Sequence, residues 1–155
     1  MIQPPKNENQ RFMRFVMVGL LNTLIDFGLM NLFTQVFKIS LVIAQALSFT
    51  VAVISAYFLN RIWIYPEAKN GSKREQFPKF VIINLLGLGL RSVLVPLFDK
   101  AIASLLNANP IHFKDLPQQF FSHNGALALV LPLTILMNFF LNRAWTFKTK
   151  KENSK

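Results

Sequence analysis

Two ionisable residues lie in the middle of long apolar stretches, where a charge is costly. Asp26 stands eleven residues after Phe15, and Arg91 stands eleven residues after Phe80. Charged side chains at the centre of a membrane span usually face protein or water, where they pair with one another or contact a substrate. We therefore expect Asp26 and Arg91 to form either a structural ion pair between two spans or part of a substrate or coupling site.

Amide side chains extend these two positions along helical faces. Asn22 precedes Asp26 by one helical turn, and Asn84 precedes Arg91 by two turns. In the last apolar stretch the corresponding polar positions are Asn138 and Asn142. Such groups either line a polar cleft or form hydrogen bonds between helices, which contribute roughly 0.6 to 2 kcal/mol each in membranes.

Small residues recur every four positions in the second apolar stretch, at Ala44, Ser48, Ala52 and Ala56. Small side chains at this spacing let two helices approach closely. We expect tight packing inside the protein, with a dimer seam as the alternative.

A duplicated sequence ends two of the apolar stretches. Residues 57–65 read YFLNRIWIY and residues 139–147 read FFLNRAWTF, with asparagine, arginine and tryptophan at the same spacing. Residues 12–33 and 77–98 also align, although less closely. The repeating unit is therefore two spans long, which predicts two parallel-repeat helical hairpins.

The duplicated segments have two interpretations. In one, Arg61 and Arg143 reach the phosphate-rich surface and Trp63 and Trp145 anchor the spans in the headgroup belt. In the other, the two arginines and nearby loop cations hold a lipid phosphate. The asparagines fit anchoring poorly, because an amide at the edge of the hydrocarbon needs partners. The residues that we expect to contact a substrate are Asn22, Asp26, Asn60, Arg61, Asn84, Arg91, Asn138, Asn142 and Arg143.

Composition favours a membrane protein over other basic proteins. The chain has 155 residues, 52% of them hydrophobic, and a formal net charge of +10. Its lysines and arginines gather beside apolar stretches, which predicts contact with anionic membrane lipids and no nucleic-acid binding. Cysteine is absent, and His112 and His123 are far apart. We expect no metal site, no cofactor and no enzymatic activity, since no catalytic motif stands out.

Length and hydropathy predict an all-α, four-transmembrane-helix bundle. The expected parts are a basic N-terminus at 1–14, one membrane domain at 15–147 with spans near 15–37, 39–60, 78–98 and 124–143, and a basic tail at 148–155. Residues 99–123 hold enough leucine and phenylalanine for a short surface-lying helix.

Charge asymmetry predicts the orientation. Thirteen lysines and arginines fall at the two termini and between the second and third spans, against Lys38, Lys100 and Lys114 on the other side. The positive-inside rule therefore places both termini in the cytoplasm.

The chain resembles the GtrA-like family of small four-span bacterial membrane proteins. The resemblance rests on RFVMVGLLNTLIDF at 14–27, AQALSFTVAVISAYFLNRIWIY at 44–65 and LTILMNFFLNRAWTF at 133–147. The first copy of the duplicated ending is less complete, with Ser55 or Ala56 in place of an asparagine and Tyr65 in place of phenylalanine. The resemblance implies movement of a polyprenyl-phosphate-linked sugar across the cytoplasmic membrane for envelope polysaccharide or teichoic acid glycosylation.

Three functional hypotheses follow. In the first, the protein flips a polyprenyl-phosphate-sugar lipid; because four spans enclose little volume, a homo-oligomer or a membrane glycosyltransferase partner is expected. The second is a small proton-coupled exporter of cationic compounds, disfavoured because Arg91 would keep Asp26 charged. The third is a non-transporting scaffold subunit of a membrane glycosyltransferase.

Overall fold

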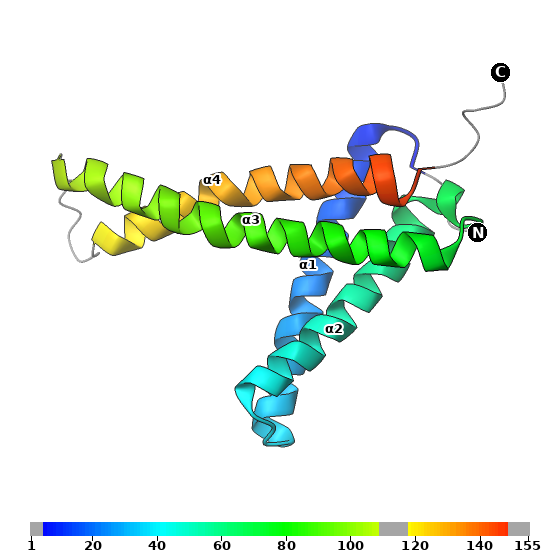
Figure 1. Ribbon diagram of the computed structural model, residues 1–155, viewed down its shortest axis with the longest axis horizontal. Coiled ribbons are helices and arrows are strands. Elements are labelled where there is room, and N and C mark those ends of the chain that lie inside the picture. The colour runs from blue at the N-terminus through cyan, green and yellow to red at the C-terminus, as the bar shows by residue number, and fades with distance from the viewer. Residues whose placement is uncertain (1–4, 109–117, 149–155) are drawn as a thin grey trace. The chain divides into compact units, whose positions relative to one another are not determined.

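The computed structural model describes residues 5–108 and 118–148, and all regular structure within them is helical (Figure 1). The main helices are α1 (Glu8–Asn31), α2 (Leu41–Leu59), α3 (Lys73–Ala108) and α4 (Gln118–Leu141). Each lies in a helical segment that is long and apolar enough to cross a membrane. The prediction of an all-α protein with four candidate membrane spans is confirmed, while the two-hairpin repeat stays a prediction.

Three of the helices end in a π-helical turn, in which the backbone N–H bonds to the carbonyl five residues earlier. These turns are η1 (Leu32–Val36), η2 (Asn60–Ile64) and η4 (Asn142–Thr146). The N–H of Tyr65 donates to the Asn60 carbonyl at 2.8 Å, and the N–H of Phe147 donates to the Asn142 carbonyl at 2.9 Å. Both copies of the duplicated segment therefore adopt the same backbone structure.

The third helix is much longer than the sequence predicts. α3 has 36 residues, which at about 1.5 Å per residue gives roughly 54 Å, against about 30 Å of hydrocarbon. Residues 99–108 continue α3, and residues 118–123 belong to α4. The prediction of a separate short helix is therefore wrong for these residues, and 109–117 lie outside the described residues.

The chain divides into two compact units, each described here by itself. The first contains Met1–Val81 and Asn142–Lys155, and the second contains Ile82–Leu141. The first unit thus holds α1, α2, the start of α3 and η4, while the second holds the rest of α3 and α4.

An aromatic cluster forms the core of the first unit at the end where η2 and η4 lie. Tyr57 is 2% exposed and packs edge-to-face against Phe77 and Phe80, with ring centroids 5.2 and 5.7 Å away. Tyr65 and Phe147 stack with centroids 4.6 Å apart. Pairs of this geometry contribute roughly 0.5 to 1.5 kcal/mol beyond their buried area.

In the second unit, α3 and α4 approach closely at two glycines. A Cβ added at Gly87 would lie 2.8 Å from Asn138 Nδ2, and one added at Gly125 would lie 3.2 Å from Ile102 Cδ1. The missing side chains let the two helices pack at these positions.

Candidate functional site

Asp26 has a hydrogen-bond partner on the neighbouring helix of its own unit. The Ser48 hydroxyl on α2 lies 2.6 Å from Asp26 Oδ1 on α1. Ser48 is fully buried, and Asp26 is half-buried. The hydroxyl also lies 3.1 Å from the Gln45 carbonyl, so two acceptors compete for its one proton. The sequence predicts Ser48 only as a small packing residue, because nothing in the pattern marks its hydroxyl as facing α1.

The small-residue stripe on α2 is buried along its whole length, with Ala44, Ser48, Ala52 and Ala56 all 7% exposed or less. This burial supports the packing interpretation over a dimer seam. One turn before Asp26, the half-buried Asn22 places its Oδ1 out of solvent with no hydrogen-bond partner among the described residues.

Three of the predicted substrate-contacting residues lie in the second unit. Asn84 and Asn138 are half-buried, and Arg91 is exposed on α3. Asn138 on α4 packs against Gly87 on α3. Asp26 belongs to the other unit, so its pairing with Arg91 stays a prediction.

Gly87→Ala is expected to destabilise the protein by about 1 to 3 kcal/mol, because the new methyl group would overlap the Asn138 amide. Gly89→Ala is the matched control, since nothing lies within 4 Å of a Cβ there and alanine favours a helix by roughly 1 kcal/mol over glycine. Thermal unfolding of the detergent-solubilised variants measures both. Equal melting temperatures for the two would contradict the close contact.

The first copy of the duplicated segment is buried. Asn60 is 2% exposed, and its side chain donates to the Ala56 carbonyl at 2.8 Å. Arg61 is 5% exposed, and its Nη2 donates to the carbonyls of Lys69 and Gly71, the latter at 2.9 Å. The guanidinium of Arg61 therefore holds the loop between η2 and α3.

Gln76 holds the same loop from its other side. Its Nε2 donates to the Ala68 carbonyl at 3.0 Å, and its Oε1 accepts from the Tyr57 hydroxyl at 3.4 Å. A Cβ at Gly71 would lie 2.5 Å from Gln76 Nε2, so the loop leaves no room for a side chain there. These contacts fix the loop and leave the Arg61 guanidinium away from the surface.

The second copy has a different environment. Asn142 is 1% exposed, like its counterpart, but the Arg143 side chain is 44% exposed and pairs with Glu8 at 2.6 Å. Trp145 is 45% exposed and lies under the ammonium of Lys79, 5.9 Å from the ring centroid. Identical sequence positions therefore present one buried arginine and one accessible arginine.

The tryptophan of the first copy also contacts a cation. Trp63 is half-buried, and the Arg14 guanidinium lies 5.6 Å from its ring centroid while Nη1 donates to its carbonyl at 2.8 Å. A cation over an indole face is stabilised by the ring quadrupole. In both copies the predicted anchor residue is thus joined to a basic side chain.

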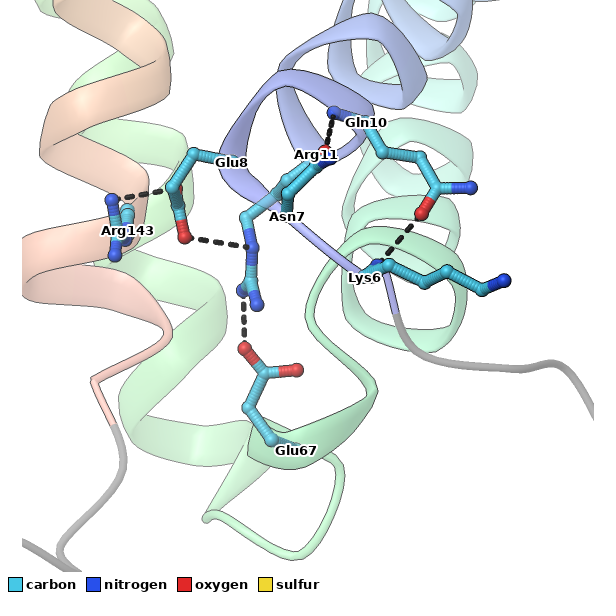
Figure 2. A network of polar contacts seen from close by, with 7 residues as sticks. All are labelled: Lys6, Asn7, Glu8, Gln10, Arg11, Glu67 and Arg143. Carbon is cyan, nitrogen blue, oxygen red and sulfur yellow. Dashed lines mark hydrogen bonds and ion pairs between the residues drawn. The ribbon is translucent and has the colours of Figure 1, made fainter.

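A network of charged residues links the start of α1, the loop after η2 and η4 (Figure 2). Arg11 pairs with Glu67, Glu8 contacts both Arg11 and Arg143, and the Arg11 guanidinium lies 5.2 Å from the Tyr65 ring centroid. Burial raises the pKa of Tyr65, and the charges of Arg11 and Arg143 oppose this shift. The phenol is therefore neutral at physiological pH.

Sequence reasoning missed this network. From the sequence, Arg11 is only one of the thirteen cations that predict the orientation, and no pattern gives Glu8 or Glu67 a role. The available signal is the helix start: Asn7 Oδ1 accepts from the Gln10 N–H at 2.8 Å, and this cap places Glu8 in the first turn of α1. Within the described ranges, no group of three histidine, cysteine or acidic residues could hold a metal ion.

Comparison with known proteins identifies the family. The model of the GtrA/DPMS transmembrane domain matches residues 14–114. The chain belongs to this family. It is also 31% identical over 140 residues to the Bacillus subtilis (strain 168) protein named "Uncharacterized membrane protein YngA", covering 90% of this chain and 81% of that protein.

Membership in the GtrA/DPMS family confirms the resemblance drawn from the sequence. With four helices suited to crossing a bilayer, this family member is a multi-pass membrane protein. At family level, membership supports a role related to the translocation of sugar-linked lipids.

Proposed function

We propose that this GtrA/DPMS family protein moves a polyprenyl-phosphate-linked sugar across the bacterial cytoplasmic membrane, for glycosylation of envelope polysaccharide or teichoic acid. The family match over residues 14–114 carries the proposal, because it covers most of the first candidate span and all of the second and third. Composition and geometry are consistent with it, but alone they describe only a membrane protein with polar groups in its spans.

Each unit, taken by itself, has polar groups within its candidate spans. In the first unit these are the Asp26 carboxylate with its Ser48 partner and the Asn22 amide. In the second unit they are Asn84, Arg91 and Asn138. Polar side chains within a membrane replace water around a hydrophilic group, while the polyprenyl tail stays in lipid.

Collection of the phosphate is assigned to Arg143 and not to Arg61. The Arg143 side chain is 44% exposed, whereas Arg61 is buried and its Nη2 already donates to two loop carbonyls. Arg61, Gln76 and Gly71 then have the structural role of holding the loop between η2 and α3.

Reconstitution tests the proposed function. Purified protein in liposomes should move a labelled polyprenyl-phosphate-linked glucose between leaflets faster than protein-free liposomes do, and Asp26→Ala should abolish the difference. No movement without an added membrane glycosyltransferase would instead favour the scaffold hypothesis.

The orientation is a separate prediction. We expect Ser72 to face the cytoplasm and Asn107, near the end of α3, to face the other side, from the thirteen-to-three distribution of cations. Both residues are exposed, and the chain has no cysteine. An impermeant thiol reagent applied to intact cells should label Asn107→Cys and spare Ser72→Cys. The reverse labelling pattern would show that the topology is opposite to the predicted one.

A further inference from the structure

One carboxylate bridges two guanidinium groups where the duplicated segments meet. Glu8 Oε2 lies 2.6 Å from Arg143 Nη1, and Glu8 Oε1 lies 3.8 Å from Arg11 Nε. Each oxygen therefore faces a different arginine, one on α1 and one on η4 (Figure 2). A pair of guanidinium groups that faces the oxygens of a carboxylate can also bind a phosphate. Arginine recognises carboxylates and phosphates alike through charge-assisted hydrogen bonds.

The two arginines are held differently. The Arg11 side chain is 14% exposed and fixed by its pair with Glu67 and by the Tyr65 ring beneath it. The Arg143 side chain is 44% exposed, and the Glu8 side chain is 50% exposed. Glu8 is thus the most exposed member of the bridge, on the first turn of α1, and it can leave without disturbing the Arg11 contacts to Glu67 and Tyr65.

We propose that Arg11 and Arg143 form a site for one phosphate group of a membrane lipid, and that the Glu8 carboxylate occupies this site in the absence of lipid. Glu8 is then an internal competitor that limits lipid binding until a phosphate displaces it. The Tyr65 ring, which stacks on Phe147, lies against the Arg11 guanidinium and helps to hold it in place.

The local charges favour this exchange. Arg11 and Arg143 are balanced by Glu8 and Glu67 in the observed state. Departure of Glu8 leaves one net positive charge among Arg11, Arg143 and Glu67. A phosphate at the membrane surface restores neutrality and adds acceptor oxygens for both guanidiniums.

The inference rests on the proposed function for the identity of the lipid, so binding is measured without translocation. The protein is placed in phosphatidylcholine nanodiscs, and the binding of a polyprenyl-phosphate-linked glucose and of phosphatidylglycerol is titrated separately. The variants are Glu8→Gln, Arg143→Gln and the double variant. Glu75→Gln is the matched control, because Glu75 is also an exposed acidic residue in the first turn of a helix.

Glu8→Gln should tighten binding by about two- to fivefold, since removing one exposed opposing charge has an effect of that order. Arg143→Gln and the double variant should both bind more weakly than the wild type, and equally. A gain for the polyprenyl-phosphate-linked glucose alone supports a site selective for the substrate lipid, and a gain for both lipids supports a general phosphate site. Unchanged or weaker binding in Glu8→Gln, or an equal gain in Glu75→Gln, would overturn the proposal. Failure of the liposome assay alongside a Glu8→Gln gain would reject the transport function and keep the site.

Discussion

Replacing Arg61 with lysine is expected to destabilise the folded protein, whereas the same replacement at Arg143 should leave stability unchanged and impair function. Arg61 is 5% exposed and donates to two loop carbonyls through one nitrogen. An ammonium is more strongly hydrated than a guanidinium, so burying it costs more. Lysine would also form poorer hydrogen bonds to the two loop carbonyls. The two effects together should lower the free energy of unfolding by about 1 to 3 kcal/mol.

Arg143→Lys should act on function instead. The side chain is accessible and its pair with Glu8 is exposed, so its contribution to stability is small. Lysine keeps the charge but lacks the planar fork that holds two phosphate oxygens. We therefore expect glycan decoration to fall severalfold in a deletion strain complemented with Arg143→Lys.

Glycan decoration is compared between Arg61→Lys and Arg143→Lys at matched membrane abundance. The thermal unfolding of each purified variant is measured as well. Arg74→Lys is the control, because Arg74 is exposed near the start of α3. A lower melting temperature for Arg143→Lys than for Arg61→Lys would contradict the assignment of the two roles. Full complementation by both variants would indicate that both arginines only anchor the spans in the membrane.

The helices were predictable because apolar stretches of about twenty residues leave few alternatives to a membrane span. Their ends were less predictable. Hydropathy falls at Asp99 and Lys100, yet α3 continues to Ala108, since the segment AIASLL consists mostly of good helix formers. Hydropathy reports where the hydrocarbon ends, whereas helix propensity and packing decide where the helix ends.

The duplicated segment was predictable as a motif, and its shared π-helical turn agrees with the duplication. The different environments of Arg61 and Arg143 were not, because the motif is the same at both positions. Arg61 meets the carbonyls of Lys69 and Gly71 shortly afterwards in the chain. Arg143 meets Glu8 from the opposite end of the chain, a contact that no local pattern contains.

Asp26→Ala is expected to abolish glycan decoration, and Ser48→Ala to reduce it severalfold. Ser48 is the hydroxyl that contacts Asp26 within the first unit, so its loss leaves the carboxylate in place with fewer hydrogen bonds. Thr50→Ala is the matched control, because the Thr50 hydroxyl is exposed and bonds to the Ala46 carbonyl of its own helix. Equal activity for Ser48→Ala and Thr50→Ala would show that the hydroxyl does not support Asp26.

Arg91→Ala should abolish decoration as well, and the double variant Asp26→Ala, Arg91→Ala decides why. If the two residues form only a structural ion pair, each single change leaves an uncompensated charge in the membrane, and removing both should restore folding and activity. If Arg91 binds the phosphate as it crosses the membrane, the double variant should fold and reach the membrane at normal abundance while remaining inactive. We expect the second result, because the proposed function requires a phosphate to pass the middle of the bilayer. Restored activity in the double variant would show that Arg91 does not bind the phosphate as it crosses the membrane.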